Sequence, residues 1–331
     1  MKDFPLGDMP LPGSPWLFVP LLILIFWLHL VAMWLMFGSL IVGIVEVVKN
    51  KVNWKESKAI RYLPVITALV INLGVPPLLF LQVLYSPFFF SSSVIISVPW
   101  LAIFFLLMIG YGFMYLARYG AQQNWQAVVC LVVSLISVTV ISFIFSNNMS
   151  LMIKPEYWKE LYSYTQNGLN LYPNLPEVVS RWLWVLSAVF AAGTAMLQRS
   201  KNWVIPSSII SIVTLIVYRG FLSTEVLSHS LVSGGIVVDL VLAAGVLLIP
   251  FLKLNDKSLR ILLFAWVGLK GAAVVAIRHG IRSATLDPVY PLNQLPVQSQ
   301  PGLITIFLIA LAIGVIAVSW MYLKGRKELA I

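Results

Sequence analysis

Three histidines are the residues of this chain best suited to ligand chemistry, and His29 occupies the most unusual position. It lies well inside an almost wholly apolar run, WLFVPLLILIFWLHLVAMWLMFGSLIVGIVE, which is long enough to cross a bilayer. An imidazole in hydrocarbon is costly and marks a haem or metal ligand, a proton path or a hydrogen bond to another helix. Met33 and Met36 follow on the same helical face, where they either pack or line a ligand pocket. The sequence leaves a haem ligand and a structural, hydrogen-bonded histidine both open for His29.

The other two histidines fall at the ends of two later apolar runs, close to arginines. His229 lies in RGFLSTEVLSHSLV, downstream of Arg219, and His279 lies in AIRHGIR between Arg278 and Arg282. Arginines bind carboxylates, such as the propionates of a haem, through paired hydrogen bonds. The alternative is that these are interfacial side chains that contact lipid phosphates. All five are candidates for haem or propionate contacts, while His29 is the best candidate for an axial ligand.

Two further charged residues, Asp239 and Lys270, lie in the interior of successive apolar runs. A short link joins these runs, so the helices are antiparallel and the two charges lie at matching depths. Isolated charges in a membrane are expensive, which predicts a neutralising ion pair between them. This pair fits a structural role and a proton path equally well.

The second apolar run combines polar residues with helix breakers. Asn72 and Gln82 lie in VINLGVPPLLFLQVLYSPFFF, and Pro76 and Pro77 remove two backbone donors in mid-membrane. Freed carbonyls in a membrane need protein or water as partners. We therefore predict a kinked helix beside a polar cavity. Together with Asp239 and Lys270, such a cavity could line a polar path, so a transporter is an alternative function.

The composition defines the class of protein that must position these residues. Of 331 residues, 60% are hydrophobic and only 10% are charged, and the mean hydropathy is +0.93. These values are typical of a polytopic membrane protein. The sequence has no Walker loop, HExxH, CxxCH or nucleophile triad, and its single cysteine excludes an intrachain disulfide. The polar, proline-containing N-terminus does not resemble a cleavable signal.

Nine apolar runs predict an all-α bundle of nine transmembrane helices within a single integral membrane domain, residues 1–331. Two longer segments, 147–181 and 279–301, are predicted as loops on the outer side. The predicted helices are 16–48, 62–85, 94–117, 126–146, 182–198, 203–222, 231–252, 260–278 and 302–323.

The distribution of Lys and Arg predicts the orientation of the bundle. Most of the 22 basic residues fall in one alternating set of segments: 49–61, 118–125, 199–202, 253–260 and the tail 324–331. Positive charge concentrates on the cytoplasmic side of membrane proteins, so the N-terminus is expected outside and the C-terminus in the cytoplasm. The net charge of +10 thus needs no nucleic acid partner.

The N-terminal half also carries a recognisable order of motifs. His29 is followed by Gly38 and Glu46 in the same run, and then by FLQVLYSPFFFSSS, VPWLAIFFLLMIGYGF and SNNMSLM. This order resembles the first four helices of subunit I of cytochrome bd-type quinol oxidases, especially the shorter relatives that travel with c-type cytochromes. The resemblance covers roughly residues 16–200. It implies that His29 ligates a b-type haem near the outer side, in a prokaryotic cytoplasmic membrane.

The chain departs from the family in three places. The third-helix glutamate of the family has no counterpart in SVPWLAIFFLLM, and the large outer quinol loop is missing. The fifth helix, which carries a haem-ligating histidine in the family, reads SRWLWVLSAVFAAGTAM here, with Trp182 and Trp184. The resemblance therefore does not imply oxygen reduction.

These observations favour a membrane electron-transfer subunit of a respiratory complex. Such a chain is a candidate subunit of a quinol-oxidising oxidoreductase. Its b-type haem would pass electrons between quinol or quinone and a c-type cytochrome or other extracytoplasmic redox subunit. The loops 147–181 and 279–301 would form the docking face, and other membrane subunits would join the complex. A haem-poor scaffold that anchors a cytochrome is the alternative, and a transporter is a further one, although no inverted repeat supports it.

Overall fold

The computed structural model describes residues 10–197, 201–298 and 300–328, and these residues form an all-α fold. No strand occurs in this part of the chain, apart from one isolated bridge between Leu11 and Val297. The expectations for both chain ends and for the link at 198–200, including the basic residue Arg199, lie outside the described residues. The expectation of an all-α bundle is thus confirmed.

Each of the nine apolar runs corresponds to one or two helices. The helices that correspond to these runs are α1 (Pro15–Val48), α2 (Lys58–Leu84), α4 (Ser97–Tyr115), α5 (Asn124–Met152), α7 (Leu175–Leu186), α8 (Val189–Leu197), α9 (Val204–Arg219), α11 (Ser230–Val246), α12 (Asp256–Leu286) and α13 (Pro301–Glu328). Three further helices, α3 (Ser86–Ile95), α6 (Trp158–Tyr164) and α10 (Thr224–Ser228), lie mainly between the runs, and one turn of π-helix, Leu116–Gly120, follows α4.

Among the residues that the structure describes, seven helical stretches are long and apolar enough to cross a membrane, so this is an integral membrane protein. The apolar helix α9 is shorter than these seven. Large apolar side chains are exposed along α4, including Leu101, Phe104 and Met108, as expected for a surface that contacts lipid.

The segment 147–181 is not the irregular loop that its polarity predicts. Helix α5 continues to Met152, α6 forms within the segment, and α7 already begins at Leu175. The polar residues are tolerated because they are buried with partners: Asn148 donates to Ser93, and Asn147 accepts from the backbone N–H of Tyr172. At Asn147 and Asn148 the polarity therefore reflects internal hydrogen bonding rather than exposure to water.

Two other predicted boundaries also differ. The run 182–198 is divided between α7 and α8 by a break after Leu186. Helix α12 extends past 278 to Leu286, so the loop starts at Asp287 rather than at 279. The side chain of Asn255 caps the start of α12 by accepting from the backbone N–H of Ser258. Pro288 has no backbone N–H and cannot continue the hydrogen bonding of the helix, which explains where α12 ends.

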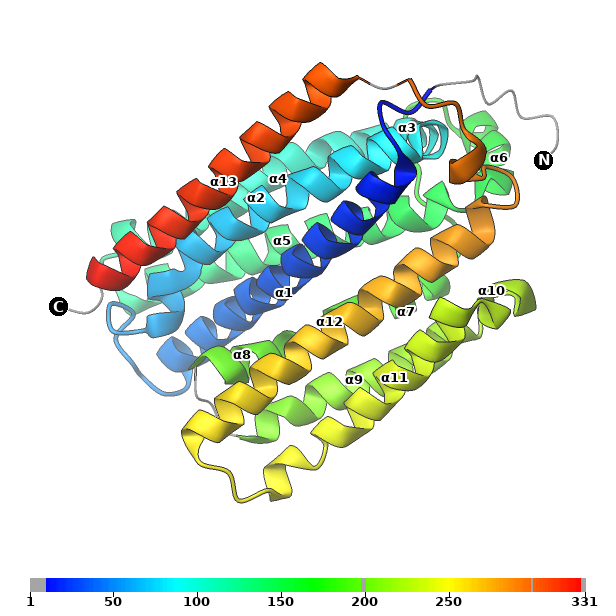
Figure 1. Ribbon diagram of the computed structural model, residues 1–331. Coiled ribbons are helices and arrows are strands. Elements are labelled where there is room, and N and C mark those ends of the chain that lie inside the picture. The colour runs from blue at the N-terminus through cyan, green and yellow to red at the C-terminus, as the bar shows by residue number, and fades with distance from the viewer. Residues whose placement is uncertain (1–9, 198–200, 299, 329–331) are drawn as a thin grey trace.

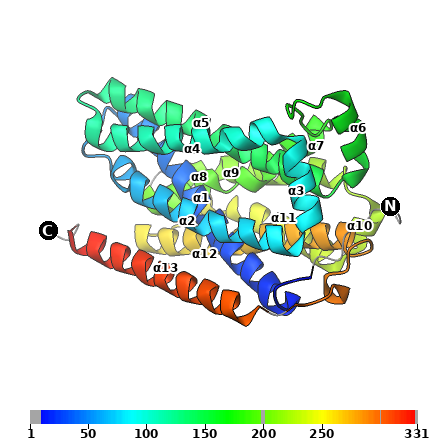
Figure 2. The same ribbon diagram turned by 90° about the horizontal axis from the view of Figure 1, so that it is seen from above.

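Helix α1 is the centre of the bundle and packs against α2, α5, α8 and α12. Figure 1 shows the long helices running side by side, with the described chain beginning and finishing at opposite ends of the bundle. Viewed from above, α4 and α5 lie on one side and α13 on the other (Figure 2). Helices α3, α6 and α10 gather at one end of the bundle, which we call the α6 end.

Two glycines allow α1 and α8 to touch. A Cβ on Gly38 would lie 2.7 Å from the backbone nitrogen of Gly193 and 2.8 Å from the carbonyl oxygen of Val189. Small residues permit such close approach between membrane helices. This contact joins the helix that carries His29 to the segment that follows Trp184.

Candidate functional site

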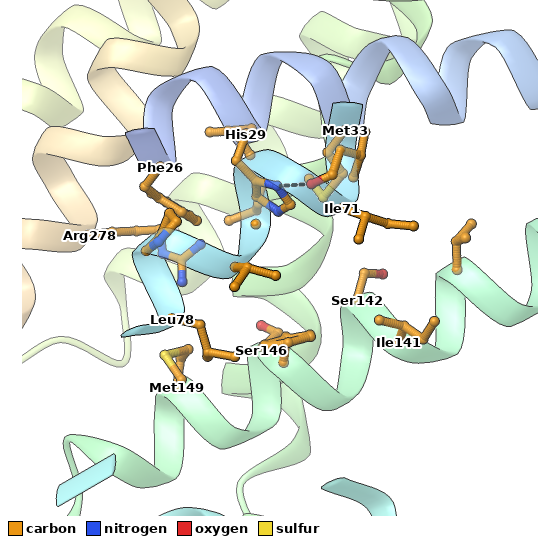
Figure 3. Close-up of a pocket in the computed structure, with 18 of the residues that line it drawn as sticks. Phe26, His29, Met33, Ile71, Leu78, Ile141, Ser142, Ser146, Met149 and Arg278 are labelled. Carbon is orange, nitrogen blue, oxygen red and sulfur yellow. Dashed lines mark hydrogen bonds between the residues drawn. The ribbon is translucent and has the colours of Figure 1, made fainter. Parts of the chain in front are cut away.

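A cavity of about 350 Å³ lies among α1, α2, α4, α5, α7 and α12. Its volume falls within the range of small-molecule sites, roughly 300–1,000 Å³. Its walls are largely apolar, and a few polar side chains reach into it (Figure 3). The lining residues that matter below are His29, Met33, Met36, Met149, Trp182, Arg278, His279 and Arg282.

The imidazole of His29 projects from α1 into this cavity (Figure 3). Its Nδ1 lies 3.0 Å from the carbonyl oxygen of Val70 in α2. A carbonyl oxygen only accepts hydrogen bonds, so Nδ1 carries the proton and Nε2 keeps its lone pair. This is the arrangement found in metal-ligating histidines, whose second nitrogen donates to a carbonyl. The two roles left open for His29, a structural hydrogen bond and a haem ligand, are therefore compatible, since each uses a different ring nitrogen.

Helix α2 supplies the space that the imidazole needs. A Cβ on Gly74 would lie 2.8 Å from Cε1 of His29 and 3.1 Å from its Nδ1. The polar cavity predicted beside this helix is wrong, because neither Asn72 nor Gln82 lines the cavity. Asn72 is exposed and donates to the carbonyl of Ala68 one turn back in its own helix.

Two arginines close the cavity on the side of α12. Arg278 lies over the ring of Phe26, with Cζ 4.6 Å from the ring centroid, and Arg282 lies over the ring of Tyr85 at 5.3 Å. The Nε atom of Arg278 is buried and has no hydrogen-bond partner among the residues that the structure describes. Burial raises the pKa of the Tyr85 phenol, and the nearby charge of Arg282 opposes that rise.

The structure brings together four of the sequence-predicted candidates and leaves two outside. His29, Arg278, His279 and Arg282 line one cavity, whereas Arg219 is exposed on α9 and His229 does not line the cavity. His229 is nevertheless close to the cavity's rim, because a Cβ on Gly280, next to His279, would lie 3.3 Å from its Nδ1.

Sequence reasoning missed Met149 and Arg181. Met149 extends from α5 into the cavity, and Arg181 on α7 is 6% exposed. The only signal for Arg181 was a lone arginine at the start of an apolar run, which fits an interfacial residue equally well. Only the fold shows that it points inward.

The predicted partners Asp239 and Lys270 form a separate, closed site. Lys270 Nζ lies 2.6 Å from Asp239 Oδ1, and both side chains are 0% exposed. Ser211 accepts from Lys270 at 2.5 Å, and the indole of Trp184 donates to Asp239 at 3.0 Å. Trp184 thus holds the carboxylate of the ion pair in place. Its neighbour Trp182 instead lines the cavity and donates to the hydroxyl of Ser142 at 2.9 Å.

The residues around the cavity fit a porphyrin that carries carboxylates. Within the described part of the chain, Nε2 of His29 has no hydrogen-bond partner and neither Arg278 nor Arg282 has an acidic partner. The cavity walls are apolar, and methionines offer soft donors. The described residues contain no group of three or more His, Cys, Asp or Glu side chains that could hold a bare metal ion.

Comparison with protein-family models, with curated proteins and with solved structures finds no match to this chain.

Proposed function

We propose that this protein is a membrane electron-transfer subunit of a respiratory complex, similar to subunit I of bd-type quinol oxidases. A b-type haem would occupy the cavity, with His29 as an axial ligand. The observation that carries this proposal is the His29–Val70 hydrogen bond, which leaves Nε2 free beside an apolar cavity with two arginines at one side.

The chain's own residues would hold and tune the cofactor. The Val70 carbonyl orients the imidazole of His29 and increases its basicity as a ligand. Arg278 and Arg282 would neutralise the propionates, and the apolar walls would exclude water, which affects the redox potential. When bound, a b-type haem supplies one-electron transfer between its ferrous and ferric states.

The proposal extends to topology and partners. The nine helices would all cross a prokaryotic cytoplasmic membrane, with the N-terminus outside and the C-terminus inside. The positive charge of the links 49–57 and 252–255, at the end opposite α6, supports this orientation. A reporter fused after Ile331 should then be active only in the cytoplasm, and activity outside would reverse the orientation.

Electrons would pass between quinol in the membrane and a c-type cytochrome docked at the α6 end. The segments 147–181 and 287–301 form the extended connections there, and they carry most of the exposed polar residues at this end. Cross-linking from Tyr164, which is 85% exposed, should capture the cytochrome, whereas capture from the opposite links alone would overturn this docking face.

A reduced-minus-oxidised absorption spectrum of the purified protein tests the haem. His29→Ala should abolish a b-type band while the helical content is retained, and His229→Ala is the matched control because His229 lies outside the cavity. A band that persists in His29→Ala would refute the axial role. Absence of extractable haem from the wild-type complex would instead favour the haem-poor scaffold. The bond from Trp184 to Asp239 also favours the scaffold, because Trp184 lies in the stretch where the bd-type oxidases carry a haem-ligating histidine.

A further inference from the structure

Beside the main cavity lies a second, much smaller one of about 10 Å³, at the lower limit for one water molecule. Arg181 from α7 and both Arg278 and Arg282 from α12 line it, and Met149 also belongs to both cavities. Three arginines from two helices therefore line one small space beside the main cavity.

These three cations repel one another. The charges of Arg181 and Arg282 both act unfavourably on Arg278, and the charge of Arg181 also acts on Arg282. Among the residues that the structure describes, the only partners found for them are neutral. Arg181 donates to the hydroxyl of Ser150 at 2.7 Å and to the carbonyl of Ser146 at 3.4 Å.

The acids nearest to this cluster are engaged elsewhere. Glu177, one turn before Arg181, accepts from the hydroxyl of Tyr172 at 2.9 Å and from Asn174 at 3.3 Å. Burial, together with the charge of Glu177, raises the pKa of Tyr172, so its phenol stays protonated and keeps donating. Asp287 accepts from Ser283 in its own turn of helix. Neither acid forms an ion pair with the three arginines in the described structure.

The aromatic neighbours do not neutralise the cluster either. Tyr218, which lines the small cavity, is a buried phenol stacked on Trp184 with ring centroids 5.9 Å apart. Phe26 and Tyr85 offer ring faces to Arg278 and Arg282. A cation over a ring is stabilised far less than one paired with an anion.

We propose that Arg181, Arg278 and Arg282 form a binding site for the oxyanion of an amphiphile that lies in the main cavity, where Arg278 and Arg282 contact it directly and Arg181 adds its charge from the adjoining small cavity. Guanidinium forks match the geometry of carboxylate and phosphate groups, and two forks with a third cation beside them suit a group with several acceptor oxygens. The apolar walls that adjoin the cluster select an anion attached to a hydrocarbon or ring system rather than a free ion. A fatty-acid carboxylate and a phospholipid phosphate share this chemistry.

The inference goes beyond the proposed function, since it needs no haem and assigns a role to Arg181. A haem propionate would be one oxyanion of this kind. The haem proposal and the oxyanion proposal can be refuted independently. The haem absorption band tests His29, whereas the preference for a charged over an uncharged amphiphile tests the three arginines.

The test compares oleate with methyl oleate, which has the same apolar chain without the charge. Binding to the protein purified in neutral detergent is followed by the fluorescence of its tryptophans, two of which, Trp182 and Trp184, lie near the cluster. The titration is carried out on the wild type and on His29→Ala. In His29→Ala no haem held by His29 can occupy the cavity. Oleate should bind about tenfold or more tightly than methyl oleate, as expected for a hydrogen-bonded charge.

Arg181→Gln and Arg278→Gln should each reduce this preference by about tenfold. Arg219→Gln is the matched control, since Arg219 is an exposed arginine at the end of α9, and it should leave the preference unchanged. Arg181→Lys and Arg278→Lys guard against misfolding, because they keep the charge and should retain part of the preference. Equal binding of oleate and methyl oleate, or a preference that survives Arg181→Gln, would overturn the site.

Two further arms identify the source of the oxyanion. Dodecyl phosphate should compete with oleate, which would extend the site to phospholipid-type headgroups, and failure to compete would restrict it to carboxylates. Inorganic phosphate should displace oleate only in large excess. Displacement by inorganic phosphate at the same concentration as dodecyl phosphate would overturn the amphiphile and assign the site to a free anion.

Discussion

Helix α12 carries cations in two regions that differ in whether the buried charge is neutralised by an acid. Lys270 is enclosed with Asp239, Ser211 and Trp184, and every polar group there has a partner. About two to three helical turns further on lies what we call the open region, where Arg278 and Arg282 face cavities and pair with no acid among the described residues. The closed site leaves no charge for a ligand to neutralise, whereas the open one presents cations to the anionic ligand that we propose.

The largest effect should come from breaking the closed region one residue at a time. Lys270→Met or Asp239→Leu alone leaves a buried charge without its partner and should destabilise the protein by about 3–5 kcal/mol. The double substitution removes both charges and should cost clearly less. Thermal unfolding in detergent measures this difference, and a double variant as unstable as the sum of the single ones would show that no ion pair stabilises this region.

The next effect tests the contact that joins the two regions. Gly38→Ala places a methyl group 2.7 Å from the Gly193 backbone nitrogen, and backbone cannot yield as a side-chain tip can. Separating α1 from α8 should destabilise the protein by about 1–3 kcal/mol, the usual cost of overpacking. Gly112→Ala is the control, since a methyl group on Gly112 would meet no heavy atom within 4 Å. Equal melting temperatures for both variants would contradict the close contact.

A smaller effect is expected when the open region loses a charge. Arg278→Met forfeits a cation–π contact worth about 0.5–2 kcal/mol but also removes a poorly compensated buried cation. These terms oppose each other, so the free energy of unfolding of ligand-free protein should change by no more than about 1 kcal/mol. Lys270→Met, on the same helix, provides the direct comparison. A loss as large as that of Lys270→Met would mean that Arg278 has a structural partner.

The two regions also differ in how far the sequence predicts them. The pairing of Asp239 with Lys270 follows from two charges at equal depth in consecutive antiparallel helices, because hydrocarbon leaves them few other partners. Helix positions follow in the same way from the apolar runs. The helical continuation to Met152 does not, since the partners of Asn147 and Asn148 come from distant segments.

The cavity is less predictable because it depends on the relative rotation of six helices. Apolar residues surround every membrane helix, so the sequence cannot distinguish those that face lipid from those that face a cavity. Arg181 illustrates this, since its inward direction follows from hydrogen bonds to Ser146 and Ser150 on another helix. Asn72 shows the reverse case, a polar residue that satisfies itself within its own helix and faces outward.

The smallest effect on stability should accompany a specific effect on the imidazole. Gly74→Ala would place a methyl group 2.8 Å from Cε1 of His29. A side chain can rotate away at low cost, and alanine favours helix over glycine by up to about 1 kcal/mol, so the melting temperature should hardly change. The displaced ring would weaken the 3.0 Å hydrogen bond to Val70 and turn Nε2 relative to the cavity. If His29 is a haem ligand, the b-type band should therefore shift or lose intensity in Gly74→Ala, while Gly112→Ala keeps the wild-type spectrum. A haem spectrum unchanged by Gly74→Ala, in a protein that retains its haem, would show that the iron is held elsewhere, and the open region would then owe its character to the arginines alone.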